Sequence, residues 1–145
     1  MDTPTHASVL VVDDDEDVRA TLRMLLEGEG YAVAEAVRVA DALAYLRTAP
    51  ANHVVLLDFL LPPVNADVLL LAVEAEACLR RHRLVLMSAS PTTRYCAEAQ
   101  RLIAALCSEV VLKPFDVADV LAAVERAEAQ VSVHLSHCSM HRVSK

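Results

Sequence analysis

Short apolar runs alternate with helical patterns five times along this chain of 145 residues. The apolar runs predict strands at residues 8–12, 31–36, 53–57, 84–87 and 110–112. Apolar spacing at helical periodicity predicts helices at residues 15–27, 39–47, 66–80, 92–106 and 116–130. Strict alternation of strands and helices predicts an α/β fold, in which a parallel sheet carries helices on both faces. Most of the runs are apolar at every position, which is typical of strands that are covered on both sides.

Composition limits the function as well as the fold. The length fits one domain, and 55% hydrophobic residues favour a packed core. Gly28 and Gly30 are the only glycines, which excludes the glycine-rich loops that hold nucleotide phosphates. A net charge of −7 argues against binding to a nucleic acid backbone and is compatible with a divalent cation.

The chain carries the features of a protein from a reducing compartment. Its four cysteines are widely spaced and form no C-x-x-C pair: Cys78, Cys96, Cys107 and Cys138. The N-terminus lacks a basic segment before its first apolar run, and no apolar run is long enough to span a membrane. We therefore expect a cytoplasmic protein without membrane contact.

Polar side chains follow every predicted strand except the second. They are Asp13 and Asp14, then Asp58, Ser88 and Lys113. Right-handed crossovers bring the carboxyl ends of parallel strands to one edge, where such sheets bind their ligands. Each residue alone has an ordinary alternative, such as a helix cap, a loop acid or a satisfied hydroxyl. Together, three carboxylates and a lysine predict a site for a hard cation such as Mg²⁺.

Four segments give this chain a resemblance to a known family. They read Val-Leu-Val-Val-Asp13-Asp14, Val-Val-Leu-Leu-Asp58-Phe-Leu-Leu-Pro62, Val-Leu-Met-Ser88-Ala89 and Val-Leu-Lys113-Pro114-Phe. In this order and spacing, over residues 8–130, they resemble the receiver domain of bacterial two-component response regulators. The resemblance, which is to stand-alone chemotaxis-type regulators, implies a flavodoxin-like doubly wound (βα)5 sheet with strand order 2-1-3-4-5.

The resemblance also implies a metal site. Asp14, Asp58 and the backbone carbonyl of Leu60 would coordinate Mg²⁺, and Asp13 would act mainly through a bound water. These four residues are the predicted metal ligands of the chain.

The remaining implied roles concern the phosphoryl group. Asp58 would be the phosphoacceptor, and Lys113 would pair first with Asp58 and then with a phosphoryl oxygen. Ser88 would hydrogen-bond another phosphoryl oxygen. The bond between Lys113 and Pro114 is expected to be cis.

The function that the resemblance implies is that of a response regulator. The chain would take a phosphoryl group from a sensor histidine kinase or a histidine phosphotransfer protein and switch its contacts with an unknown protein target. We expect no direct contact with nucleic acid and no catalysis beyond its own phosphorylation and dephosphorylation. A homodimer is possible. Three alternatives stay open: a phosphorylation-independent pseudo-receiver, a receiver fragment of a longer regulator, and a Mg²⁺-dependent phosphohydrolase that uses Asp58 as nucleophile.

The sequence departs from the family pattern at several positions. Val110 stands where the family usually has an aromatic switch residue, and Ala66 stands where it usually has glycine. The segment between Ser88 and Lys113 is longer than usual, with the extra residues expected in the 90–95 loop or the fourth helix. Leu60 cannot orient an attacking water, so we expect shielding to govern the lifetime of the phosphoryl group.

The third predicted helix and the C-terminal segment each carry a further sequence feature. The run at residues 68–71 is apolar enough to predict a core helix with some exposed side chains, a possible partner or dimer surface. The domain is expected to span residues 1–130, with a short flexible tail at 131–145. The tail contains a set of residues that would share one face of a helix and could bind Zn²⁺: His134, His137, Cys138 and His141.

Overall fold

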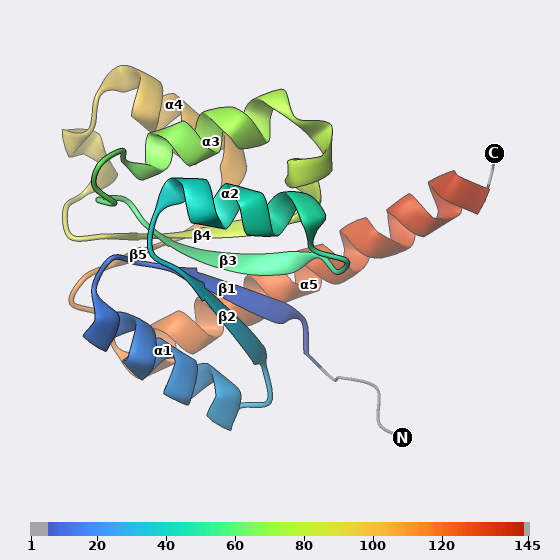
Figure 1. Cartoon of the computed structure of the whole chain (residues 1–145), viewed down its shortest axis with the longest axis horizontal. Helices are drawn as coiled ribbons and strands as arrows, with labels where there is room; N and C mark the ends of the chain where they lie inside the picture. The colour runs from blue at the N-terminus through green and yellow to red at the C-terminus, as the bar shows by residue number, and fades with distance from the viewer. Residues whose placement is uncertain (1–5, 144–145) are drawn as a thin grey trace.

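Five parallel strands form one sheet in the order β2-β1-β3-β4-β5 (Figure 1). The computed structural model describes residues 6–143, with side chains as far as Val131. The strands are β1 (Ser8–Val12), β2 (Ala32–Ala36), β3 (His53–Asp58), β4 (Arg83–Ser88) and β5 (Cys107–Leu112). Every neighbouring pair is parallel. The fold class and the strand order implied by the resemblance are both confirmed.

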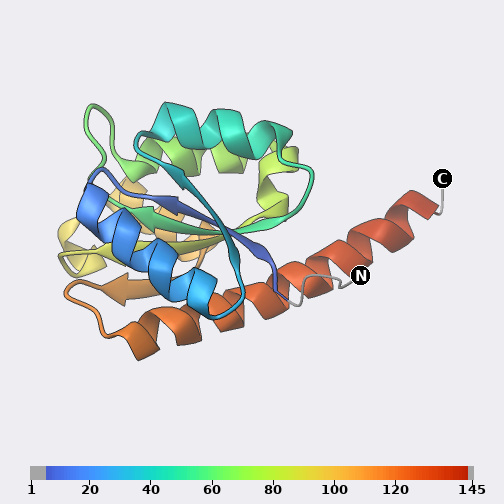
Figure 2. The ribbon, with the colours of Figure 1, turned by 60° about the horizontal axis from the view of Figure 1, so that its bottom comes forward.

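Helices cover both faces of this sheet (Figures 1 and 2). One face carries α1 (Glu16–Gly28) and α5 (Val117–Val143), and the other carries α2 (Val39–Thr48), α3 (Ala66–Ala75) and α4 (Ala97–Leu106). Two separate clusters of buried side chains fill the spaces between sheet and helices. The molecule is therefore built of three layers, with the strand ends free to form a site at the edge.

The central strand β3 shows why the apolar runs do not alternate with polar residues. Val55 and Leu57 belong to the cluster under α2, α3 and α4, whereas Val54 and Leu56 belong to the cluster under α1 and α5. All four side chains are fully buried. Because successive side chains of a strand point to opposite faces, a strand with helices on both sides needs apolar residues at every position.

Local signals explain where α1 begins and ends. The Asp15 carboxylate caps the helix by accepting hydrogen bonds from the N–H groups of Asp17 (2.9 Å) and Val18 (3.3 Å). After the helix, Gly30 adopts a φ of 97°, a conformation that side chains disfavour. The chain can then turn directly into β2.

Two predicted helices are shorter than the sequence pattern indicated. The helix expected over residues 66–80 ends at Ala75, because Glu76 is extended, and a 3₁₀ turn, η1 (Ala77–Arg81), follows. The helix expected over residues 92–106 is divided into a 3₁₀ turn, η2 (Thr92–Arg94), and α4. In both cases the apolar spacing continues past the point where the helix is interrupted. Periodicity alone therefore could not locate the end of the helix.

Strand β5 and helix α5 are longer than predicted by three residues or more. Strand β5 begins at Cys107, and its pairing with β4 shifts in register between Leu84 and Val85. Helix α5 continues past residue 130 to Val143. The side chains of His134, His137, Cys138 and His141 lie outside the described residues, and the division of the chain at residue 130 stays a prediction. Among the described residues, no helix has the length and apolar character needed to cross a membrane.

A pair of buried histidines links the far ends of β3 and β4 to α2. The His82 ring accepts a hydrogen bond from the His53 backbone N–H (2.9 Å) and donates one to the Leu46 carbonyl (3.2 Å). The His53 ring donates to the Ala51 carbonyl (2.8 Å) and accepts from the Tyr45 hydroxyl (2.9 Å). Each ring is thus held as one neutral tautomer. Burial lowers the pKa of both, that of His82 to about 4.

The buried His82 should make folding sensitive to acid. The unfolded chain binds a proton at His82 below about pH 6.5, whereas the folded chain binds it only below about pH 4. Because the unfolded state binds more protons between these values, the free energy of unfolding should fall as the pH drops through this window, by about 3 kcal/mol from His82.

Urea unfolding of the wild type and of His82→Asn, at steps from pH 7 to pH 4, measures this effect. Asparagine retains an acceptor for the His53 N–H but does not titrate. The variant should be less stable at pH 7, and the difference should narrow towards pH 4. Parallel curves for the two proteins would contradict the assignment to His82.

Candidate functional site

The polar residues predicted at the strand ends come together at the carboxyl edge of the sheet. Asp13 and Asp14 directly follow β1, Asp58 and Ser88 are the last residues of β3 and β4, and Lys113 directly follows β5. One carboxylate oxygen from each of Asp13, Asp14 and Asp58 lies within 4.8 Å of the others. The structure therefore assembles an acidic cluster from segments that are far apart in the sequence.

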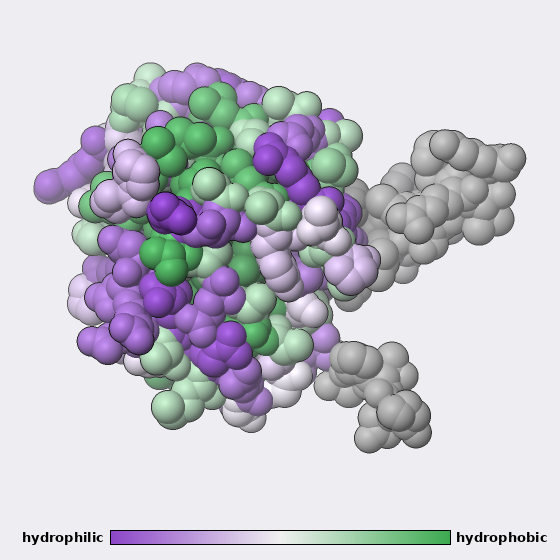
Figure 3. Space-filling view, viewed as in Figure 1, coloured by the Kyte–Doolittle hydropathy of each residue, from purple (hydrophilic) through white to green (hydrophobic). Residues whose placement is uncertain are grey.

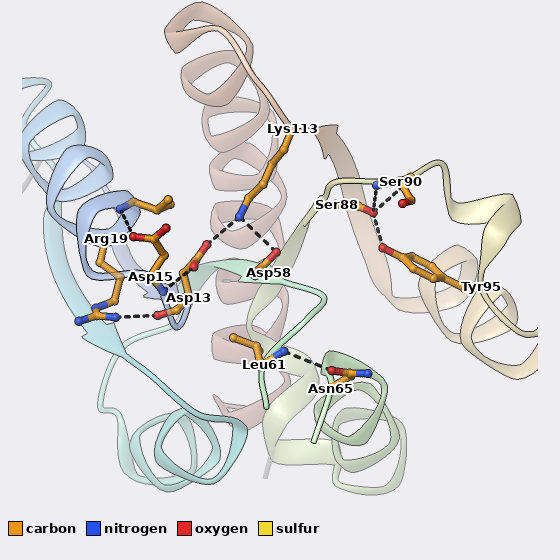
Figure 4. A network of polar contacts seen from close by, with 11 residues as sticks. Asp13, Asp15, Arg19, Asp58, Leu61, Asn65, Ser88, Ser90, Tyr95 and Lys113 are labelled. Carbon is orange, nitrogen blue, oxygen red and sulfur yellow. Dashed lines mark hydrogen bonds and ion pairs between the residues drawn. The ribbon is translucent and has the colours of Figure 1, made fainter. Parts of the chain in front are cut away.

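Lys113 bridges two of the three carboxylates (Figure 4). Its Nζ atom lies 3.0 Å from Asp13 Oδ2 and 3.3 Å from Asp58 Oδ1. The backbone N–H of Lys113 donates to the Ser88 carbonyl at 2.7 Å, so the sheet itself determines where the lysine emerges. The following bond to Pro114 is cis, as expected.

The carboxylates differ in how fully the chain already engages them. Asp13 is 1% exposed, and its two oxygens accept hydrogen bonds from the Asp15 N–H (2.9 Å) and from Lys113 (3.0 Å). The Asp13 carbonyl also accepts from Arg19 Nη1 at 2.9 Å. Asp14 is exposed, and among residues 6–131, whose side chains the structure describes, no hydrogen bond engages its carboxylate. Asp14 thus has oxygens free for a cation, whereas Asp13 is held in place by the protein.

Negative charge is in excess in this partly buried cluster. Burial, followed by repulsion from Asp13, raises the pKa of Asp58 to about 6, although Lys113 opposes this shift. Burial alone would lower the pKa of Lys113, but Asp13 and Asp58 more than compensate, and its pKa is raised. A single lysine does not balance three carboxylates. The arrangement therefore favours a bound cation, which oxygen ligands of this kind can hold.

Ser88 is fully buried, but its hydroxyl is directed away from the acidic cluster (Figure 4). The hydroxyl donates to the Ser90 carbonyl at 2.5 Å, accepts from the Ser90 N–H at 3.2 Å and is hydrogen-bonded to the Tyr95 hydroxyl. In Figure 4, no dashed line joins the Ser88 hydroxyl to the Asp58 carboxylate or to the Lys113 ammonium group. Ser88 thus occupies the predicted position, at the edge of the site, in a conformation that faces the loop before α4.

Sequence reasoning missed two aromatic residues beside the site. The Tyr95 ring stacks on the ring of Phe59, with centroids 3.9 Å apart and planes inclined by 13°. Phe59 directly follows Asp58, and Tyr95 ends the loop in which extra residues were expected. The long segment between Ser88 and Lys113 indicated a longer loop. Nothing in the sequence indicated that Phe59 and Tyr95, which lie on separate crossovers, would be in contact.

The residues that depart from the family pattern differ in their exposure to solvent. Val110 lies on β5 with its side chain 42% exposed, and Leu60 is 57% exposed in the loop after β3. Ala66 is fully buried at the start of α3, where its N–H donates to the Phe59 carbonyl at 2.8 Å. The methyl group in place of glycine is therefore accommodated within the packed start of the helix.

Helix α3 exposes part of its apolar run, as predicted. Leu69, Leu70 and Val73 are buried, whereas Val68 and Leu71 are about half exposed. Figure 3 shows hydrophobic residues gathered over this helix. A partner or dimer surface at this place stays a prediction.

Comparison with known proteins identifies the family. The family described as "Response regulator receiver domain" matches residues 9–125 of the chain. The chain belongs to this family. Receiver domains act in two-component signalling, as the sequence predicts. The chain is also 41% identical over 63 residues to "Transcriptional regulatory protein ResD" of Bacillus subtilis (strain 168), a match that covers 43% of this chain and 25% of ResD.

Solved structures confirm the fold. A CheY-like receiver domain from Methanospirillum hungatei JF-1 is 21% identical, with a TM-score of 0.71, covering 92% of this chain and 99% of that one. The receiver domain of an HD domain-containing protein from Pseudomonas fluorescens Pf-5 is 20% identical, with a TM-score of 0.79, covering 94% and 96%. Chemotaxis response regulator CheY4 of Vibrio cholerae is 23% identical, with a TM-score of 0.73, covering 85% and 99%.

Removing the charge of Asp58 should stabilise the protein in the absence of divalent cations. Its raised pKa means that the ionised carboxylate opposes folding at pH values above about 6. Asp58→Asn should therefore raise the free energy of unfolding at pH 7.5 by about 1–3 kcal/mol. The measurement is urea unfolding in the presence of a chelator.

The matched control is Asp41→Asn, the same chemical change at an exposed acid on α2 that pairs with the exposed Arg38. This variant should stay within about 0.5 kcal/mol of the wild type. A less stable Asp58→Asn protein would show that the Asp58–Lys113 ion pair outweighs the repulsion among the carboxylates.

Proposed function

We propose that this receiver domain accepts a phosphoryl group on Asp58 in a Mg²⁺-dependent reaction and thereby switches its contacts with other proteins. The observation that carries the proposal is the placement of Lys113 between Asp13 and Asp58 at the edge of an acidic cluster. Phosphoryl transfer needs a nucleophile whose surroundings neutralise the charge of the transferred group. The cluster offers a carboxylate nucleophile together with a resident ammonium group.

The donor set fits Mg²⁺, a hard cation that takes oxygen ligands and retains several waters. Asp14, Asp58 and the backbone carbonyl of Leu60 would hold the ion, and Asp13 would contact it mainly through water. The free carboxylate of Asp14 and the occupied oxygens of Asp13 support this division. When bound, Mg²⁺ neutralises charge on the phosphoryl oxygens.

The protein's own residues have distinct roles in this proposal. Asp58 attacks the phosphorus atom of the donor through its ionised carboxylate. As the new O–P bond forms, the P–N bond to the donor histidine breaks and the histidine leaves. Lys113 keeps the carboxylate oriented and then pairs with a phosphoryl oxygen, while Asp13 holds the lysine in place. Ser88 turns to bind a second phosphoryl oxygen. The donor is the phosphohistidine of a sensor kinase or a histidine phosphotransfer protein. The target is a protein whose binding to this domain changes when Asp58 is phosphorylated. The chain would function in the cytoplasm and catalyse only its own phosphorylation and dephosphorylation.

Incubation with Mg²⁺ and acetyl phosphate tests the proposal, with intact mass as the readout. The wild type should gain the mass of one phosphoryl group, and Asp58→Asn should gain none. Asp41→Asn, which removes an acid from α2 by the same chemical change, should label like the wild type. A chelator should abolish labelling, and full labelling in its presence would contradict the need for Mg²⁺.

Other outcomes identify the alternative functions. Labelling of Asp58→Asn would place the phosphoryl group elsewhere. Steady turnover of p-nitrophenyl phosphate by the wild type would indicate a phosphohydrolase. An unlabelled wild type would indicate a phosphorylation-independent binding module.

The lifetime of the phosphoryl group should depend on Leu60. Its apolar side chain cannot hydrogen-bond a water for attack on the phosphoryl group, so an amide at this position should accelerate hydrolysis. Leu60→Asn should shorten the lifetime of the label about tenfold, a modest gain for orienting a reactant. Val64→Asn makes a similar change at another exposed apolar residue of the same loop and should leave the lifetime unchanged.

The measurement is the decay of the phosphorylated mass after removal of the donor. Loss of the wild-type label within seconds would contradict the shielding role of Leu60.

A further inference from the structure

We propose that Tyr95 is a positioning residue that holds Ser88 away from the phosphorylation site in the resting state. In this proposal, phosphorylation of Asp58 draws the Ser88 hydroxyl from Tyr95 to the phosphoryl group, and the freed Tyr95 acts on α4. The inference rests on the proposed function, because it assigns Ser88 to the phosphoryl group.

The hydrogen bonds of Ser88 carry the first step. A hydroxyl offers one donor and two acceptor positions. Ser88 Oγ donates to the Ser90 carbonyl, accepts from the Ser90 N–H and is hydrogen-bonded to the Tyr95 hydroxyl, so Tyr95 takes the second acceptor position. A phosphoryl oxygen only accepts hydrogen bonds, and the single O–H of Ser88 is already donated. Ser88 must therefore rotate to reach it, and that rotation breaks the contact with Tyr95.

The second step concerns the Tyr95 ring. It stacks on Phe59, the residue that directly follows Asp58. One side chain thus contacts both the hydroxyl that must move and the neighbour of the proposed phosphoacceptor. Tyr95 is half-buried and packs against the hydrophobic core beside Phe59, so loss of its hydroxyl partner leaves the ring held by apolar contacts only, and these allow it to turn towards solvent.

The third step links Tyr95 to α4. The Tyr95 N–H donates to the Thr92 carbonyl (3.1 Å), which closes η2, and its carbonyl accepts from Gln100 Nε2 of α4 at 2.8 Å. The main chain of Tyr95 thus connects η2 with the first turn of α4, and a movement of Tyr95 that includes its main chain acts on both. Val110, an exposed aliphatic residue on β5, has no hydroxyl or ring with which to make these contacts.

Fluorine NMR of protein labelled with 3-fluorotyrosine tests the movement. The chain has three tyrosines, Tyr31, Tyr45 and Tyr95, and single Phe variants assign their signals. With Mg²⁺ and acetyl phosphate, the Tyr95 signal should shift in proportion to the labelled mass, while the other two stay in place. A labelled protein with an unchanged Tyr95 signal overturns the inference but not the proposed function. The absence of any label overturns both.

The variant Tyr95→Phe tests the positioning role separately. It keeps a ring to stack on Phe59 but removes the hydroxyl that holds Ser88. The rate of labelling by acetyl phosphate should rise about fivefold, the size expected for one neutral hydrogen bond lost from the resting state. Tyr45→Phe removes a hydroxyl that binds His53, away from the site, and should label at the wild-type rate.

A double-mutant cycle distinguishes positioning from a general effect on packing. Ser88→Ala should label more slowly than the wild type, and adding Tyr95→Phe to it should cause no further change, since the hydroxyl that Tyr95 holds is gone. A wild-type rate for Tyr95→Phe, or an equal effect of this change in the Ser88→Ala background, would overturn the proposal.

Discussion

The charge crowding around Lys113 is the constraint on which the rest of the site depends. One ammonium group lies between Asp13 and Asp58, and a third carboxylate, that of Asp14, lies within reach of the same centre. Burial strengthens the repulsion among the acids because the surroundings screen it weakly. The protein tolerates this arrangement because the packed sheet holds the strand ends in place. The surplus negative charge favours the binding of a cation or a cationic group at this edge of the sheet. The edge therefore has the properties of a binding site.

The three-layer packing makes such crowding possible. Helices on both faces bury the central strands completely, so each strand end is determined by the sheet and not by its own loop. The backbone N–H of Lys113 bonds to the carbonyl of Ser88, which means that two predicted site residues share one interstrand contact. The Ser88 hydroxyl is in turn bonded to Ser90 and Tyr95 in the loop before α4, so a change in the conformation of Ser88 alters the contacts of that loop. The proposed switch would therefore act at the same sheet edge that holds the strand ends in place.

Much of this could be predicted from particular residues. The unbroken apolar runs before Asp13 and Asp58 indicated buried parallel strands, and the polar residue after each run indicated the edge at which they meet. The helix breaks were not predictable in the same way, since Glu76 interrupts an apolar pattern that continues to Leu79. The stacking of Tyr95 on Phe59 was also beyond sequence reasoning, because neither residue belongs to a periodic pattern and their contact joins two crossovers.

The sequence by itself determined the fold class, the set of polar residues at the carboxyl edge and the family to which they point. These properties follow from hydrophobic periodicity and from residue order. Both can be read from each segment of the chain without knowledge of how the segments pack. Only the tertiary structure decided which carboxylate oxygens are free, which ones Lys113 engages and where the Ser88 hydroxyl is directed. Those properties depend on distances between side chains from different strands and loops. They are set by how the helices pack on the sheet, and no single segment of the sequence contains that information.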